Sequence, residues 1–387
     1  MIHVPEGMLD RLRDMVGGIA TRPLLSRAPG RVEVLGNHTD YNGGIVLAAT
    51  IDRFVWSLGI PAADPTICSA DYQDLVSFST ESLSPTGMHR WYDYAKGVYW
   101  ALLRRKQQPK GVAAVIHGNV PIGAGLSSSA AFEVSLTNLV AEISQLDLKP
   151  KDSAMAAFEA ERLYCGVACG VMDQFTSQLG KPHSSLAIFC STLETRDIPL
   201  SSDVSLVITD SMISRSAGDA LNQRMIECQT ALKTLRQAGW QISSLSDVTS
   251  DRLKLVDSML DDKLAKRVRH VVTENERVLL GIKALQEGRV RDFGMIMYES
   301  HNSSRNLYDV SHPRLDLLVD IAKRQDGVIG SRMTGAGLGG AVLSLVESKQ
   351  VSQFVKHVTA EYARETGQVP NAMACKVPGG VTVDPVP

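Results

Sequence analysis

The ten residues from Pro121 to Ala130, PIGAGLSSSA, constrain this chain more than any other segment. Gly123 and Gly125 allow φ angles that a side chain would forbid, so the backbone can pass close to a bulky anion. Three serines follow at the start of a helix predicted over residues 127–146, and a strand is predicted over 112–117. The free N–H groups of such a helix start form an anion-binding site. An ordinary glycine turn into a serine-capped helix explains the segment alone equally well.

Bulk composition excludes several classes of protein. The 387 residues suffice for two or three domains of about 150 residues each. A net charge of -2 disfavours nucleic acid or an anionic membrane as the main partner. No apolar run approaches the length of a membrane span, and the charged N-terminus lacks the apolar core of a signal peptide, so we expect a cytoplasmic location. The six cysteines form no C-x-x-C pair; Cys165 and Cys169, four residues apart, could bind a metal but are better explained by packing.

A second segment, from Arg27 to Gly44, gathers polar side chains around one turn. A short strand over 32–35 is predicted to enter this turn, and a strand over 45–51 to leave it. Arginine, asparagine, histidine, threonine, aspartate and tyrosine side chains then offer many hydrogen bonds at one place, as a polyhydroxylated ligand requires. The alternative is a solvated loop.

Two single residues are also candidates. Trp91 opens a helix predicted to continue to Leu103; it could stack on a nucleobase, although aromatic residues are more often part of a core. Asp173 follows a glycine-containing turn and lies in the first turn of a predicted helix, where the helix dipole stabilises a carboxylate. Asp173 is therefore either a helix-start charge or a group that orients or deprotonates an attacking hydroxyl.

The second half of the chain alternates strands with longer helices. We predict a strand over 205–210, helices over 219–238 and 348–366, a mostly helical interval over 246–299, and a glycine-rich bridge between two strands over 328–342. The predicted domains are residues 1–182 and 183–387. Gly335, Gly337 and Gly340 match G-x-G-x-x-G, but no acidic residue lies about twenty positions further on, which argues against a dinucleotide fold. The absence of G-x-x-x-x-G-K-[ST] from the sequence argues against an ordinary P-loop NTPase.

Taken together, the motifs resemble one family. PIGAGLSSSA resembles the phosphate loop of the GHMP small-molecule kinases, and RMTGAGLGG resembles their C-terminal glycine-rich motif. GRVEVLGNHTDYNGG and CGVMDQF resemble the galactokinase branch of that family. The resemblance covers nearly the whole chain. It implies a mixed α/β fold of two domains, with the active site in the cleft between them. It also implies transfer of the γ-phosphate of ATP to the C1 hydroxyl of galactose, with Mg²⁺, by a monomer.

The resemblance also assigns roles to individual residues. It implies that Asp173 and Arg31 are catalytic and that Ser129 and Glu161 bind magnesium. The implied sugar contacts are Arg31, Asn37, His38, Asp40, Gly170 and Asp173. The implied ATP contacts are Trp91, Pro121, Gly123, Gly125, Leu126, Ser127, Ser128, Ser129, Gly335 and Gly337.

Two positions depart from the galactokinase pattern. Asn37 stands where the family has a sugar-contacting glutamate, and Leu221 where it has a tyrosine. An asparagine can donate a hydrogen bond and does not repel an anion. A C6-altered sugar such as galacturonate is therefore an alternative substrate. A catalytically silent sensor of sugar and ATP is a third possibility, which the presence of Asp173, Arg31 and Glu161 disfavours.

Overall fold

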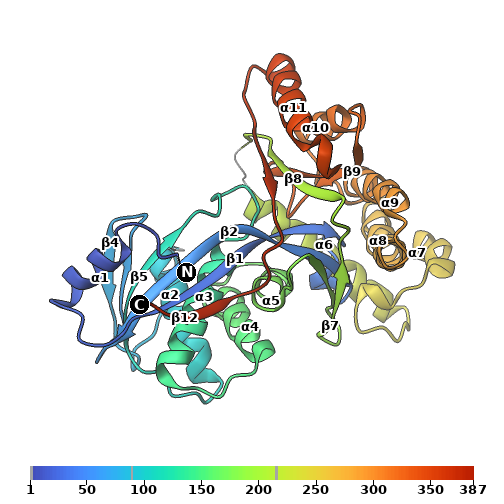
Figure 1. The fold of residues 1–387 in the computed structure, drawn as a ribbon. Coiled ribbons are helices and arrows are strands. Elements are labelled where there is room, and N and C mark those ends of the chain that lie inside the picture. Colours follow the sequence, from blue (N-terminus) through green and yellow to red (C-terminus); the bar gives the residue numbers. More distant parts are fainter. Residues whose placement is uncertain (1–2, 89, 214–216) are drawn as a thin grey trace.

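The computed structural model describes residues 3–88, 90–213 and 217–387, which form two β-sheets with helices packed against them (Figure 1). The strands of the first sheet are β1 (Leu24–Leu35), β2 (Ile45–Pro61), β3 (Thr66–Ser69), β4 (Asp74–Ser77), β5 (Val112–Gly118), β6 (Ser184–Phe189), β7 (Glu194–Pro199) and β12 (Thr382–Pro385). Their order is β12-β1-β2-β5-β3-β4, with β6 beside β2 and β7 beside β6. Neighbouring strands run antiparallel, apart from the parallel pair β3 and β5.

The second sheet is antiparallel and smaller. Its strands are β8 (Val204–Asp210), β9 (Val328–Met333), β10 (Ala341–Glu347) and β11 (Asn371–Cys375), in the order β11-β8-β10-β9. The chain passes to this sheet after β7 and returns to the first sheet for β12, which lies beside β1 (Figure 1). Since β6 and β7 pair within the first sheet, this sheet extends beyond residue 182. The boundary at 182/183 stays a prediction, and sheet membership favours a boundary between β7 and β8.

Helices cover both sheets (Figure 1). They are α1 (Met8–Val16), α2 (Trp91–Arg104), α3 (Ser128–Ser144), α4 (Pro150–Glu159), α5 (Met172–Leu179), α6 (Ala217–Gln237), α7 (Leu253–Met259), α8 (Asp262–Gln286), α9 (Val290–Ser303), α10 (Pro313–Lys323) and α11 (Val351–Thr366). Two π-helical turns, η2 (Ala160–Tyr164) and η5 (Ser304–Tyr308), extend α4 and α9. In the described part of the chain, no helix is both long and apolar enough to span a membrane.

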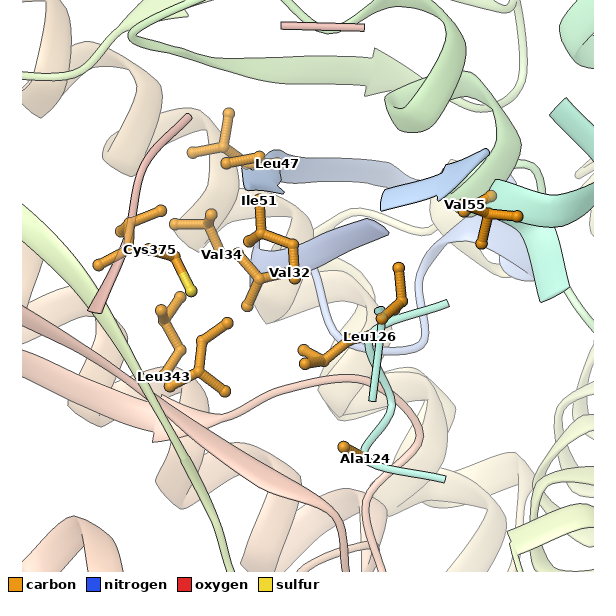
Figure 2. Close-up of a cluster of buried hydrophobic side chains, with 14 of the residues drawn as sticks. Val32, Val34, Leu47, Ile51, Val55, Ala124, Leu126, Leu343 and Cys375 are labelled. Atoms are coloured by element: carbon orange, nitrogen blue, oxygen red, sulfur yellow. The ribbon is translucent and has the colours of Figure 1, made fainter. Parts of the chain in front are cut away.

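One hydrophobic core connects the two sheets. Figure 2 shows Val32 and Val34 of β1 close to Leu343 of β10 and Cys375 of β11, and all four belong to the same buried cluster. Because successive side chains of a strand point to opposite faces, the valines fill this core while the residues between them face away from it. The strand β1 therefore carries core residues on one face and site residues on the other. This arrangement confirms the predicted mixed α/β fold.

The segment leading into the polar turn is longer than predicted. The sequence predicts a short strand from Val32, but β1 begins at Leu24. Pro29 and Gly30 lie inside β1, where the β1–β2 pairing changes register. Proline and glycine are tolerated inside a strand at such irregularities. Both strands that hold the polar turn are therefore long and paired along their length.

Candidate active site

The loop between β5 and α3, residues 121–129, is here called the glycine loop. Gly123 and Gly125 both have φ of 80°. Ser127, the residue before α3, has a left-handed backbone, and its hydroxyl donates to Asp173 Oδ2. Within the described chain no side chain caps α3, so the serine-capped helix considered as an alternative is wrong. The first N–H groups of α3 and the positive end of its dipole are left for an anion.

Asp173 is fixed by an arginine that also fixes the glycine loop. Arg31 Nε donates to Asp173 Oδ1 and Arg31 Nη2 to Asp173 Oδ2, both at 2.7 Å. Arg31 Nη1 donates to the Gly125 carbonyl at 2.6 Å, and the Arg31 amide to the Leu126 carbonyl at 3.1 Å. Such bidentate, charge-assisted pairs have defined geometry. Arg31 therefore holds the Asp173 carboxylate, at the start of α5, next to the glycine loop.

A second group of carboxylates lies beside this pair. The π-helical turn η2 presents Glu161, whose Oε1 accepts from the Ser129 hydroxyl at 2.8 Å. Gln174 Nε2 bridges Glu161 Oε2 at 2.6 Å and Glu133 Oε2 at 3.1 Å. Burial, with the charge of Asp173 beside it, raises the pKa of Glu161 to about 7. Like charges held this close favour a cation between them.

The polar turn, residues 36–43, connects β1 to β2. Asn37 is buried, and its Nδ2 donates to Glu33 Oε1 at 3.1 Å and to the Gly335 carbonyl at 2.9 Å. Its Oδ1 accepts from the Ser304 hydroxyl at 2.9 Å. The Asn37 side chain is therefore engaged by protein groups on three sides.

His38 is also held from several sides. Its ring nitrogens lie 2.8 Å from the Tyr41 hydroxyl and 3.1 Å from the Ala336 carbonyl, and its ring stacks on Tyr308 with centroids 4.9 Å apart. Burial, with His270 nearby, lowers the pKa of His38 to about 3, so the imidazole is neutral. A neutral ring can donate one hydrogen bond and accept another.

Side chains of helix α8 form hydrogen bonds with the backbone of the polar turn. Glu274 Oε1 accepts from the amides of Gly36 and Asn37 at 3.1 and 3.3 Å. His270 Nε2 lies 2.8 Å from the Asn37 carbonyl. Burial opposes ionisation of Glu274, but Arg277 and other positive neighbours outweigh it and hold the pKa of Glu274 at about 2. The polar turn is therefore a buried structural unit, which excludes the solvated-loop alternative.

Asp40 faces the site from the same turn. It approaches Gly170 so closely that a Cβ on Gly170 would overlap the Asp40 carboxylate. Burial and the charge of Asp173 raise the pKa of Asp40 to about 7. Gly170 is thus required by close packing rather than by a turn.

Two cavities meet at Ser128 and Ser129, which line both. The first, of about 270 Å³, is also lined by most of the residues expected at the site: Arg31, Asn37, His38, Asp40, Pro121, Gly123, Gly125, Leu126, Ser127, Glu161, Gly170, Asp173 and Gly335. The second, of about 480 Å³, is lined by Trp91, whose Nε1 donates to Asp74 at 3.0 Å. Gly337 lines neither cavity within the described residues; it packs against the Val310 backbone.

Leu221, which stands at the position of the family's tyrosine, lines the first cavity. Four other site residues carry no sequence prediction: Glu33, which lines the same cavity, and Glu133, Gln174 and Glu274, which support it. Two signals could have pointed to some of them. Glu133 is an acidic residue between Phe132 and Val134 in the predicted helix, and Glu33 is two positions from Arg31 in a strand, hence on the same face.

The chain matches known families along most of its length. The GHMP kinases N terminal domain matches residues 93–181 and the GHMP kinases C terminal family matches residues 282–364. The galactokinase galactose-binding signature matches residues 18–59, which include the polar turn.

Individual relatives agree with this assignment. The galactokinase of Chloroflexus aggregans is 39% identical over 361 residues, which cover 92% of this chain and 93% of the relative. The galactokinase of a Roseiflexus species is also 39% identical, covering 92% of each chain. The crystal structure of Lactococcus lactis galactokinase complexed with galactose matches with a TM-score of 0.92 at 29% identity, covering 96% of this chain and 98% of that one. A mevalonate kinase structure, with a TM-score of 0.65 at 18% identity, shares the fold. The chain therefore belongs to the galactokinase family of the GHMP kinases.

Proposed function

We propose that this protein transfers the γ-phosphoryl group of ATP to the C1 hydroxyl of galactose, giving galactose 1-phosphate. The observation that carries the proposal is the position of Asp173. It lies in the first cavity, paired with Arg31 and adjacent to the uncapped start of α3. A sugar hydroxyl beside Asp173 and a phosphate on the glycine loop would then face each other. Phosphoryl transfer depends mostly on such positioning.

Each side of the site has a distinct role. The glycine loop and the N–H groups of α3 bind the phosphates of ATP, and the second cavity, beside Trp91, holds the base. Asp173 accepts or orients the proton of the attacking C1 hydroxyl. Arg31 keeps that carboxylate in place and steadies the charge that develops during transfer. The ATP contacts proposed for Gly335 and Gly337 rest on the motif alone, because Gly335 binds the polar turn and Gly337 packs on Val310.

Ser129 and Glu161 are the proposed magnesium ligands. The buried Glu161 carboxylate lies beside Asp173 and a serine hydroxyl, and oxygen donors of this kind suit Mg²⁺. The described residues hold no group of three or more His, Cys, Asp or Glu arranged for a metal, so phosphate oxygens and water would complete the coordination. A bound Mg²⁺ neutralises charge on the transferred phosphate. The monomeric state and the cytoplasmic location stay predictions.

The structure weighs against galacturonate as substrate. That alternative relies on Asn37 donating to an anionic group, but the hydrogen bonds to Glu33 and Gly335 already use both Asn37 amide protons. A carboxylate in the same cavity, that of Glu33, would also repel the anion.

A coupled assay of ADP formation, with ATP and Mg²⁺ against galactose, glucose, N-acetylgalactosamine and galacturonate, tests the proposed function. We expect turnover with galactose that disappears in Asp173→Ala. Faster turnover of galacturonate would establish the C6-altered alternative. Binding of ATP and galactose with no ADP formed would establish the sensor.

A further inference from the structure

The first cavity contains a buried carboxylate, that of Glu33, to which the proposed mechanism assigns no role. Glu33 lies two residues after Arg31 in β1, so both side chains point to the same face, roughly 7 Å apart along the strand. Arg31 holds Asp173, whereas Glu33 lies deeper, beside Asn37, and both line the cavity. A sugar with its C1 hydroxyl at Asp173 would therefore extend its opposite edge toward Glu33.

The two oxygens of the Glu33 carboxylate differ in their contacts. Oε1 accepts from Arg332 Nη1 at 2.8 Å and from Asn37 Nδ2 at 3.1 Å. Oε2 has one longer contact, with the same Asn37 Nδ2 at 3.3 Å. Because a carboxylate oxygen can accept two hydrogen bonds, Oε2 keeps accepting capacity that a ligand hydroxyl could use. Arg332 is fully buried, and its ion pair with Glu33 anchors the carboxylate in one orientation.

Asn37 has no comparable capacity to donate. One proton of its amide is directed at Glu33 and the other at the Gly335 carbonyl, while Ser304 donates to its oxygen. A substrate hydroxyl that needed a donor from Asn37 would have to break one of these buried bonds, which is unfavourable. The Asn37 side chain thus holds Glu33 from one side and the glycine-rich bridge from the other.

We propose that Glu33 is a specificity-determining residue of this kinase, accepting a hydrogen bond from the hydroxyl across the sugar ring from C1, and that Asn37 is a positioning residue for it. This inference rests on the proposed function. The carboxylate expected at position 37 is then relocated to position 33 rather than lost. A sugar bearing a hydroxyl donor at C4 or C6 is bound, and one bearing an anion there is rejected.

The experiment compares wild type with Glu33→Gln on galactose and on its 2-, 3-, 4- and 6-deoxy forms, measuring kcat/KM. We expect Glu33→Gln to lower kcat/KM for galactose by about 10- to 100-fold, because a charged acceptor is lost. That loss should nearly vanish for either the 4-deoxy or the 6-deoxy sugar, which lacks the hydroxyl, and persist for the 2-deoxy and 3-deoxy sugars. An equal loss on all four deoxy sugars would overturn the inference.

Glu274→Gln is the matched control. Glu274 is also a buried carboxylate that contacts the polar turn, but it binds backbone amides and does not line the first cavity. Its loss should affect all the sugars equally. If Glu274→Gln changed the ratio of kcat/KM between galactose and one deoxy sugar, the sugar discrimination would depend on the polar turn as a whole. That result would contradict a role specific to Glu33.

Removing the Glu33 charge leaves Arg332 buried without its carboxylate, so a second variant guards against unfolding. The exchange E33N/N37E keeps one carboxylate and one amide in the same place. We expect it to recover most of the galactose turnover lost in Glu33→Gln and to restore discrimination against the same deoxy sugar. An exchange variant that is folded, by circular dichroism, and yet equally slow on every sugar overturns the inference. Failure of wild type to phosphorylate galactose would instead refute the proposed function.

Discussion

The two sides of the active site are built in opposite ways. The polar turn is buried and bound by side chains that lie more than two hundred residues later in the chain, among them His270, Glu274 and Ser304. The glycine loop joins strand β5 to helix α3, which follow one another in sequence; Arg31 binds its Gly125 and Leu126 carbonyls, and its Gly123 stands in open space. The sugar side is therefore preorganised without a ligand, whereas the nucleotide side offers free backbone donors that suit an anion.

The charges follow the same division. On the sugar side two buried carboxylates have cationic partners, Glu33 with Arg332 and Glu274 with Arg277, whereas Asp40 forms no ion pair among the described residues and faces Asp173. On the nucleotide side Glu161 and Glu133 share one glutamine and face Asp173. Magnesium and ATP would complete the second set, so ligand binding should stabilise the nucleotide side more than the sugar side.

The largest expected effect comes from the residue where the two sides meet. Asp173→Asn keeps the size of the side chain but removes the proton acceptor, and should lower kcat by about 10²- to 10⁴-fold. Because the polar turn is held independently of Asp173, galactose should still bind. Rapid quench kinetics and calorimetric titration with galactose measure the two quantities. Loss of galactose binding equal to the loss of kcat would show that the sugar side depends on Asp173 and would break the comparison.

The next largest effect is on the free energy of unfolding and concerns His270, which binds the backbone of the polar turn. Burial lowers the pKa of His270 from 6.5 to about 4. The unfolded chain therefore takes up this proton at higher pH than the folded chain, so the contribution of neutral His270 is complete above about pH 6.5 and is lost as the pH falls toward about 4. We expect the stability advantage of wild type over His270→Gln to shrink by up to about 3 kcal/mol across that interval.

Urea unfolding at a series of pH values, followed by circular dichroism, checks this prediction. His357→Gln, on the exposed face of α11, controls for loss of a histidine as such. If the free energy of unfolding changed with pH in the same way for wild type and for His270→Gln, the polar turn would not depend on a neutral His270.

A smaller effect is expected where the polar turn meets the loop before α5. A methyl group at Gly170 would overlap the Asp40 carboxylate, and overpacking of this kind costs about 1–3 kcal/mol. Gly170→Ala should therefore raise KM for galactose by up to about a hundredfold while KM for ATP changes little. Steady-state kinetics with each substrate varied in turn measure both. An equal rise in the two KM values would indicate a general distortion of the site.

The same division explains which features the sequence predicts. The sequence predicts a helix over 127–146, and α3 is found at Ser128–Ser144. The glycine-rich bridge predicted over 328–342 includes all of β9 and the start of β10, and residues 334–340 connect the two strands. Those predictions succeed because periodicity and glycine spacing are local properties. The roles of Glu274 and Tyr308 depend on contacts made only after the two sheets have packed, so no local pattern carries them.

Errors at element ends have similar causes. Asp152 and Ser153 are both residue types that favour a helix start, but α4 begins at Pro150 with Lys149 before it. Proline suits a first helical position because its missing N–H has no partner there. The π-helical turn that presents Glu161 follows α4, and such turns are rare and occur frequently at functional sites, so helix periodicity does not predict them.

The smallest expected effect comes from adding a methyl group to Gly123 of the glycine loop. Gly123 has φ of 80° and open space where a Cβ would stand within the described chain. Gly123→Ala therefore adds backbone strain without a clash, of about 1–2 kcal/mol. We expect KM for ATP to rise by about three- to thirtyfold and KM for galactose to stay unchanged.

Gly288→Ala is the matched control. Gly288 has φ of 70° and equally open space in the turn before α9, so the variant carries the same strain remote from both cavities and should leave both KM values unchanged. If Gly123→Ala raised KM for galactose as well, the loop and the polar turn would be coupled, and the sugar side would no longer count as preorganised on its own.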